Sequence, residues 1–303
     1  MRVVLSGASG LIGTALAADL AGAGYEVIRL VRRPPRAAGE IQWDPLTRGS
    51  LDPAAVSGAD GVIHLSGAPI AEGRWTDARK AELRASRVQS TSTLVQALTA
   101  AEVRPPVLLC GSAIGWYGDT GDRAVDESAP AGSGFLAGLV GDWEAAAGQA
   151  STAGIRVANL RTGIVLSRHG GMLARLTPLF RLGLGTRFGA GGQYTSWITL
   201  TDEVRAIRFL QDQSGIDGPV NLTAPSPVTN AELTAALART LGRPALLRIP
   251  GPLLRAGLGE VSSELLSGAR VLPRKLQDAG FVFRYPDIAT ALTAELTPHR
   301  PAA

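Results

Sequence analysis

Three evenly spaced glycines stand near the start of the chain, in the stretch SGASGLIG. They follow a short apolar run and open a segment whose apolar residues have helical spacing. At such a turn the missing side chains let a pyrophosphate approach the backbone, and the helix start offers it free N–H groups. The spacing differs from that of G-x-G-x-x-G, but the position after a first strand is typical of a dinucleotide site. The residues expected to contact the pyrophosphate are Gly7, Ser9, Gly10, Leu11, Ile12 and Gly13.

Two adjacent arginines follow the second apolar run, in RLVRRPPR. A site that takes NAD usually has Asp or Glu there, to bind the ribose 2′-hydroxyl. Arg32 and Arg33 stand at that point instead, and we expect no carboxylate near them. A guanidinium fork suits a 2′-phosphate. The alternative is a pair of solvated arginines in a loop, but together with the glycine turn the pair predicts NADP(H) as the cofactor.

Polar groups also follow three later apolar runs, in HLSGAPI, GSAIGWYG and NLRTG. Because the carboxyl ends of parallel strands meet at one edge of a sheet, these groups are expected to gather beside the cofactor. The residues expected at this edge, with the neighbours that would lie against the cofactor, are Leu65, Ser66, Gly67, Ser112, Tyr117, Arg161 and Thr162.

The composition is that of a soluble globular chain of 303 residues, 45% hydrophobic and 18% charged. The net charge is +4, and the basic residues are spread out, so we expect no nucleic-acid partner. Arginine dominates: of the 30 basic residues only Lys80 and Lys275 are lysines. The partner we expect is a small-molecule substrate.

A single cysteine, Cys110, excludes a disulfide within the chain and fits a reducing compartment. His, Cys and carboxylates show no metal-ligand spacing, so no metal is expected. The sequence carries no leader pattern and no apolar stretch of membrane-spanning length. These features predict a cytoplasmic protein without a membrane partner; a homodimer is left open.

The elements needed to position these groups follow an alternating pattern in the first half. Strands are expected at Arg2–Ser6, Glu26–Val31, Asp60–Ser66, Val107–Gly111 and Arg156–Leu160, and helices at Leu11–Ala23, Thr76–Ala101 and Phe135–Ala153. Further on we expect a strand at Gln193–Leu200, a helix at Thr201–Gln213, a strand at Pro219–Leu222 and a helix at Val228–Leu241. This order predicts an α/β fold with a doubly wound parallel sheet.

The predicted domain organisation has a cofactor domain at 1–220 and a small substrate domain at 221–303. Residues 165–200 are expected to contribute to the second lobe. The tail, Pro298–Ala303, is expected to be frayed.

Taken together, the motifs resemble the extended or atypical short-chain dehydrogenase/reductases and the NAD-dependent epimerase/dehydratase superfamily. The likeness is greatest to a divergent "epimerase family" branch with a small C-terminal domain of unknown function. It covers almost the whole chain and rests on SGASGLIG, HLSGAPI, RWTDARKAELRASRVQST, GSAIGWYG, GFLAGLVGDWEAAA, NLRTGIVLS, TSWITLTDEVRAI and NLTAPSPVTNAEL. The resemblance implies a Rossmann-like domain with a smaller C-terminal substrate lobe, and it implies that Arg87 approaches the cofactor.

The sequence departs from the superfamily in its catalytic residues. The usual Tyr-x-x-x-Lys is absent, and Phe135 and Leu139 stand where it is expected. Tyr117 is then the best candidate for the proton donor, with Ser112 as its hydrogen-bond partner. The alternative is that Tyr117 belongs to a structural turn. Arg74, Trp75 and Lys80 are weaker candidates that would border the substrate.

Two hypotheses on function follow. The first is an NADP(H)-dependent oxidoreductase or epimerase that acts on a small carbonyl or sugar-like molecule. The second is a catalytically degenerate protein that binds NADP(H) as a sensor and regulates a partner.

Overall fold

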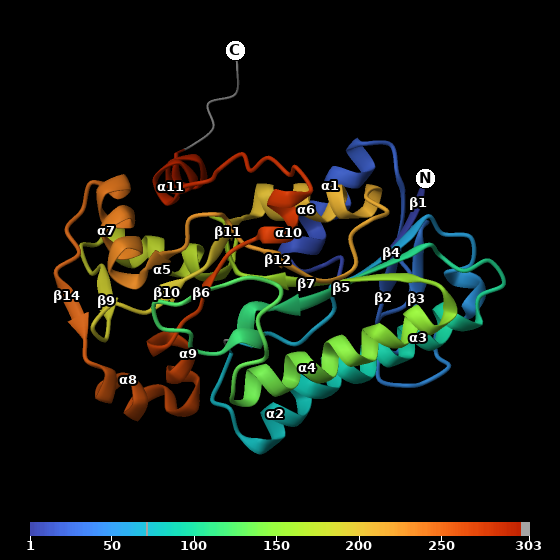
Figure 1. Ribbon diagram of the computed structural model, residues 1–303, viewed down its shortest axis with the longest axis horizontal. Helices are drawn as coiled ribbons and strands as arrows, with labels where there is room; N and C mark the ends of the chain where they lie inside the picture. The colour runs from blue at the N-terminus through green and yellow to red at the C-terminus, as the bar shows by residue number, and fades with distance from the viewer. Residues whose placement is uncertain (71, 298–303) are drawn as a thin grey trace, which may run out of the picture. The chain divides into compact units, whose positions relative to one another are not determined.

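The computed structural model describes residues 1–70 and 72–297 (Figure 1). The tail expected to fray lies outside these residues. The chain divides into two compact units. The first unit comprises Met1–Trp116, Ser133–Arg161 and Val204–Val220, and the second comprises Tyr117–Gly132, Thr162–Glu203 and Asn221–Ala303. The predicted domain boundary near residue 220 stays a prediction.

A seven-stranded parallel sheet forms the centre of the first unit, in the order β12-β7-β5-β4-β1-β2-β3. Its strands are β1 (Arg2–Ser6), β2 (Glu26–Val31), β3 (Glu40–Gln42), β4 (Gly61–His64), β5 (Val107–Ala113), β7 (Arg156–Thr162) and β12 (Gly218–Leu222). The β1–β4 and β4–β5 registers align Ser6, His64 and Cys110 in one row across the sheet. The loops that begin just after this row therefore leave the sheet at a common edge.

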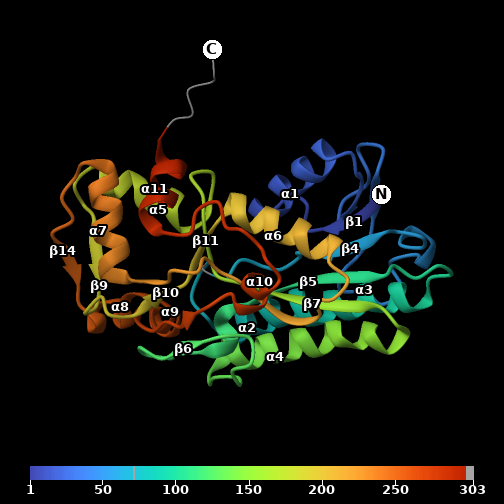
Figure 2. The same cartoon turned by 45° about the horizontal axis from the view of Figure 1, so that its top comes forward.

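Helices cover both faces of this sheet, with α1 and α6 on one side and α3 and α4 on the other (Figures 1 and 2). The helices are α1 (Leu11–Gly22), α2 (Asp77–Arg84), α3 (Ser90–Ala100), α4 (Phe135–Gly148) and α6 (Leu200–Asp212), joined by the π turn η2 (Ala85–Gln89) and the short 3₁₀ turns η1 (Pro53–Ala55), η3 (Ile114–Tyr117) and η4 (Gln149–Ala153). The face of the sheet toward α3 and α4 packs in an apolar core that includes Val62, Leu94, Leu108 and Trp143. The predicted fold class is confirmed.

The second unit is built from short strand pairs and helices around its own core, which includes Phe180, Trp197 and Leu237. Its paired strands are β8 (Ile164–Leu166) with β11 (Trp197–Thr199), β9 (Thr186–Phe188) with β14 (Leu247–Ile249), β10 (Tyr194–Thr195) with β13 (Val228–Thr229), and β6 (Ala124–Val125) with β15 (Arg270–Val271). Its helices are α5 (Gly171–Arg181), α7 (Asn230–Leu241), α8 (Gly251–Leu258), α9 (Ser262–Leu266), α10 (Arg274–Asp278) and α11 (Ile288–Leu296), with the 3₁₀ turn η5 (Gly259–Val261).

Two predicted elements are interrupted in the structure. The strand expected over Gln193–Leu200 is split at Ser196, whose hydroxyl donates to the carbonyl of Ala269 at 2.7 Å and accepts from the N–H of Val271 at 2.9 Å. The helix expected over Thr76–Ala101 contains the π turn at Ala85–Gln89. There the Ser90 hydroxyl bonds back to the carbonyl of Ser86 at 2.8 Å. Such back-bonding and π turns are recognised ways in which a helix departs from regular geometry.

Candidate functional site

The glycine turn connects β1 to α1 and has the geometry that a dinucleotide needs. Gly7 has a φ of +73°, and a Cβ there would lie 2.6 Å from the carbonyl carbon of Leu65. A Cβ on Gly13 would lie 2.2 Å from the oxygen of Gly7, so α1 can start this close to β1 only with glycine. Gly10 is the N-cap and supplies no side-chain cap to α1. The positive end of the helix is therefore left for an anion.

The arginine pair at the end of β2 is split into two different environments. Arg33 donates through both terminal nitrogens to Glu40, at 2.7 Å each. This contact lowers the pKa of Glu40 to about 2, helped by the N–H of Arg36. The expectation that no carboxylate lies near the pair is thus wrong, because the short strand β3 brings Glu40 alongside β2. Arg32 is exposed and has no hydrogen bond or ion pair with the other described residues.

The loop after β4 carries Leu65, Ser66 and Gly67 and is held by the helix that follows it. Arg87 donates to the carbonyl of Ala68 at 3.0 Å, and the N–H of Ala68 donates to the Ser86 hydroxyl at 3.0 Å. Both side chains come from the π turn, which aims them at the loop. The resemblance implies that Arg87 approaches the cofactor. The structure shows its contact with this loop, and its role toward a cofactor stays a prediction.

Arg87 is a buried cation without a carboxylate partner among the described residues. It is 7% exposed, donates also to the carbonyl of Leu83 at 3.2 Å, and lies 5.3 Å from the ring centre of Trp143. Burial, together with the charge of Arg79, lowers its pKa to about 10. Its Nε is buried without a partner within the described chain. A buried positive charge with an unused donor suits an anionic ligand beside this loop.

His64 lies beneath the same edge, fully buried at the end of β4. Its Nδ1 lies 2.6 Å from the Ser6 hydroxyl and its Nε2 lies 3.3 Å from the Ser90 hydroxyl. Burial lowers the pKa of His64 to about 4, so the ring is neutral near pH 7. This chain of side chains ties β1, β4 and α3 together under the glycine turn.

Ser112 lies within β5 rather than after it, because the strand continues to Ala113. Its hydroxyl donates to Oε1 of Glu144 at 2.6 Å. Arg161, from β7, holds both oxygens of the same carboxylate at 2.8 Å. The Arg161 guanidinium also lies 4.3 Å from the ring centre of Trp116. The predicted residues Ser112 and Arg161 are thus joined through Glu144, which was not predicted from the sequence.

Tyr117 and Thr162 belong to the second unit. The Tyr117 side chain is 3% exposed, and its hydroxyl donates to Oδ1 of Asn221 at 2.7 Å. The Asn221 amide nitrogen donates in turn to the carbonyl of Leu272 at 2.9 Å. These contacts hold the Tyr117 hydroxyl inside the second unit, and the choice between a proton donor and a structural role stays a prediction.

Thr162 donates its hydroxyl proton to Oε1 of Glu203 at 2.8 Å. Glu203 is fully buried in the first turn of α6, and its Oε2 has no partner among the described residues. Burial raises the pKa of Glu203 to about 8, so the acid is largely protonated near pH 7. Glu203 was not predicted from the sequence either.

A cationic side chain lies beside the position of the absent tyrosine. Phe135 is the first residue of α4, and Leu139, one turn later, is 1% exposed. The Lys80 ammonium lies 5.3 Å from the Phe135 ring centre, and the Trp75 ring packs edge-on against the same ring at 5.3 Å. The Lys80 ammonium, from α2, thus lies beside the residue that stands where the resemblance implies a tyrosine.

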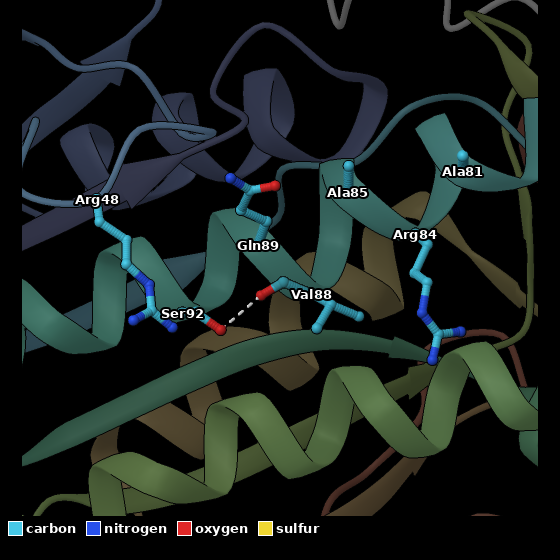
Figure 3. A pocket seen from close by; sticks show the side chains of 7 residues that line it. All are labelled: Arg48, Ala81, Arg84, Ala85, Val88, Gln89 and Ser92. Atoms are coloured by element: carbon cyan, nitrogen blue, oxygen red, sulfur yellow. Dashed lines mark hydrogen bonds between the residues drawn. The ribbon is translucent and has the colours of Figure 1, made fainter. Parts of the chain in front are cut away.

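A surface hollow of 530 Å³ lies along α2, η2 and α3 (Figure 3). Arg48 and Arg84 stand at its two ends, and the hydroxyl of Ser92 in its floor donates to the carbonyl of Val88 at 2.9 Å (Figure 3). Its lining comprises Arg48, Ala81, Arg84, Ala85, Val88, Gln89 and Ser92. None of them belongs to the predicted cofactor set, so this hollow is separate from the glycine turn.

The residues of the first unit fit a phosphate-bearing dinucleotide. The uncapped helix start would hold a pyrophosphate, next to Gly7 and Gly13, where a Cβ would meet backbone atoms at 2.6 Å and 2.2 Å. Arg32 offers an unused guanidinium at the end of β2, and Arg87 offers a buried one beside the loop after β4. Such a group would supply hydride chemistry when bound. Among the described residues no cluster of His, Cys, Asp and Glu could hold a metal ion, and no helix could span a membrane.

This combination of a parallel sheet, a glycine turn and an uncapped first helix defines a dinucleotide-binding protein of the Rossmann-like class. A family model described as the NAD dependent epimerase/dehydratase family matches residues 3–222, and a model for a domain of unknown function, DUF1731, matches residues 249–295. The chain belongs to the NAD-dependent epimerase/dehydratase family, and the resemblance drawn from its motifs is confirmed.

Relatives with similar sequences cover nearly the whole chain. An epimerase family protein of Mycobacterium tuberculosis is 49% identical over 291 residues, which are 96% of each chain. The epimerase family protein SDR39U1 of Mus musculus is 35% identical over 296 residues, which are 96% of this chain and 98% of that one.

Two solved structures extend the comparison. The human epimerase family protein SDR39U1, crystallised with NADPH, has 32% identity and a TM-score of 0.89 and covers 97% of this chain and 99% of its own. A nucleoside-diphosphate sugar epimerase of Corynebacterium glutamicum has 36% identity and a TM-score of 0.81. The match covers 98% of this chain but 58% of that one.

Proposed function

We propose that this chain binds NADP(H) at its glycine turn and transfers hydride between the nicotinamide and a small carbonyl or sugar-like substrate. The observation that carries the proposal is the uncapped start of α1 over Gly7, Gly10 and Gly13. NADPH in the structure of the human relative supports the predicted cofactor, since that protein shares the fold over nearly its whole length.

The choice of NADPH over NADH rests on Arg32. Arg33 has its donors engaged by Glu40, whereas Arg32 is exposed at the end of β2. A guanidinium that binds a 2′-phosphate makes charge-assisted hydrogen bonds, each worth about 1.5–3 kcal/mol.

Cofactor titrations test this choice. Wild-type protein should bind NADPH at least about tenfold more tightly than NADH, and Arg32→Ala should remove most of that ratio. Arg48→Ala, which removes an exposed arginine outside the site, should leave the ratio unchanged. Equal binding of both cofactors by the wild type, or an unchanged ratio in Arg32→Ala, would contradict the assignment.

Whether the chain turns over a substrate separates the two functional hypotheses. The absent Tyr-x-x-x-Lys and the buried Tyr117 hydroxyl favour the sensor, whereas the Lys80 ammonium beside Phe135 favours an enzyme with a different proton donor. A panel of carbonyl compounds and nucleotide sugars, followed by NADPH absorbance, decides between them. Turnover that is lost in Lys80→Met and kept in Tyr117→Phe would assign the donor to Lys80; the opposite pattern would assign it to Tyr117. Tight NADPH binding without turnover on the whole panel would leave the sensor.

The cytoplasmic location and the homodimer belong to the same proposal. Cell fractionation and light scattering of the purified protein test them directly.

A further inference from the structure

The Ser112 hydroxyl has one proton to donate, and its direction is fixed by its neighbours. Oγ lies 2.6 Å from Oε1 of Glu144, which is short, as expected for a hydroxyl that donates to a carboxylate. Glu144 has no donor to return, because both of its oxygens accept from Arg161 at 2.8 Å in an ion pair.

The cluster is buried and braced, so this arrangement is costly to change. Ser112 is 6% exposed, the Arg161 side chain is 3% exposed and the Glu144 side chain is 12% exposed. The Trp116 ring covers the guanidinium at 4.3 Å. If the Ser112 proton turned toward a ligand, the largely buried Glu144 carboxylate would lose one of its hydrogen-bond donors, which is unfavourable in a site shielded from water.

Ser112 also stands at the edge where the cofactor loops leave the sheet. Cys110 belongs to the row that it forms with Ser6 and His64, and Ser112 lies two residues further along β5. The neighbouring strand is β4, which leads into Leu65–Gly67. Because its proton is engaged by Glu144, the Ser112 oxygen can only accept a hydrogen bond from a ligand at this edge.

We propose that Glu144 and Arg161 fix Ser112 as a hydrogen-bond acceptor, so that it binds an N–H or O–H group of the bound molecule and not a bare carbonyl oxygen. Glu144 is a positioning residue in this arrangement, since it acts through Ser112. The inference rests on the proposed function, in which two groups have the required chemistry: the carboxamide N–H of the nicotinamide and a hydroxyl of the substrate.

The first arm of the test uses a cofactor pair that differs only in the donor. The acetylpyridine analogue of NADP keeps the carbonyl of the carboxamide and replaces its NH₂ with a methyl group. If the carboxamide donates to Ser112, wild-type protein should bind the analogue about tenfold more weakly than NADP, and Ser112→Ala should bind the two within about twofold of each other. Ser92→Ala, whose hydroxyl bonds within its own helix, is the matched control and should keep the wild-type ratio.

The second arm uses cyclohexanol and cyclohexanone as probes of the loaded protein, with binding measured by saturation-transfer NMR. If a substrate hydroxyl donates to Ser112, the alcohol should bind better than the ketone in the wild type and not in Ser112→Ala. A preference in either arm that disappears in Ser112→Ala supports the proposal and identifies the donor.

Two further variants test the role of the ion pair. Glu144→Gln keeps an acceptor oxygen for Ser112 and should keep the preference. The double variant Glu144→Met with Arg161→Met replaces the buried pair with apolar residues of similar length, an exchange that buried ion pairs often tolerate. It frees the Ser112 proton and should reduce the preference to about twofold or less.

The failures are distinguishable. If NADPH does not bind to the wild type, the proposed function is wrong. If NADPH binds but neither arm shows a preference, or the preference survives in Ser112→Ala or in the folded double variant, the assigned polarity of Ser112 is wrong.

Discussion

Acidification should destabilise the folded protein through one buried histidine. His64 is fully buried with a pKa lowered to about 4, against 6.5 for the exposed side chain. At pH values between these two pKa values, the unfolded chain binds a proton at His64 and the folded chain does not. The free energy of unfolding therefore falls as the pH falls. Between about pH 7 and about pH 4.5, this proton uptake costs the folded state about 2 kcal/mol.

Urea unfolding at a series of pH values measures this loss, and His64→Asn is the matched variant. Asparagine keeps a polar group near Ser6 and Ser90 but does not titrate, so the variant should lose about 2 kcal/mol less than the wild type over the same window. The comparison between the two proteins cancels the titration of carboxylates that both share.

Histidine NMR gives the pKa itself. The His64 ring should remain neutral at about pH 5, whereas an exposed histidine is mostly protonated there. If the His64 resonance titrates near 6.5, or if His64→Asn loses as much stability as the wild type, the assignment of a buried neutral ring is refuted.

Three other changes have definite expected outcomes. Gly13→Ala places a Cβ about 2.2 Å from the Gly7 oxygen, so it should lower both the melting temperature and the affinity for NADPH. Gly22→Ala in the same helix is the control, because its Cβ meets nothing within 4 Å and it should change neither property by much. Equal effects of the two variants in thermal melts and NADPH titrations would contradict this reasoning. Glu203 has its pKa raised to about 8, so the wild type should lose about 1 kcal/mol from about pH 7 to about pH 9, and urea unfolding should show no such loss in Glu203→Gln. Thr229→Ala removes the capping box of α7 and should cost about 1 kcal/mol in urea unfolding; no change would mean that the cap does not stabilise this unit.

The local elements of the cofactor half could be predicted because each carries its own signal. The first two strands have the bounds that their apolar runs predicted. The glycine turn was recognisable because its evenly spaced glycines stand between a strand pattern and a helix pattern. The order of strand and helix then implied the parallel sheet, since crossovers in such units have a fixed hand.

The charged contacts in the sheet and its covering helices could not be predicted, because they depend on how the elements pack and not on local sequence patterns. Glu40 reaches Arg33 only because a three-residue strand, too short to stand out in the sequence, pairs with β2. Glu144 reaches Ser112 across 32 positions and Arg161 across 17. A signal for Glu144 was present, since it follows Trp143 in a helix whose other residues are largely apolar, and a charge there needs a partner.

The π turn between α2 and α3 gives the chain a freedom that a regular helix lacks. A π turn holds one residue more than the α-helical path, so each residue beyond it is rotated by about 100° about the axis. Ser86 and Arg87 can therefore face the loop after β4 while α3 keeps its apolar residues against the sheet. The side chains that hold the loop and those that pack on the sheet can thus be changed separately, because the extra residue places them on different faces of one continuous helix.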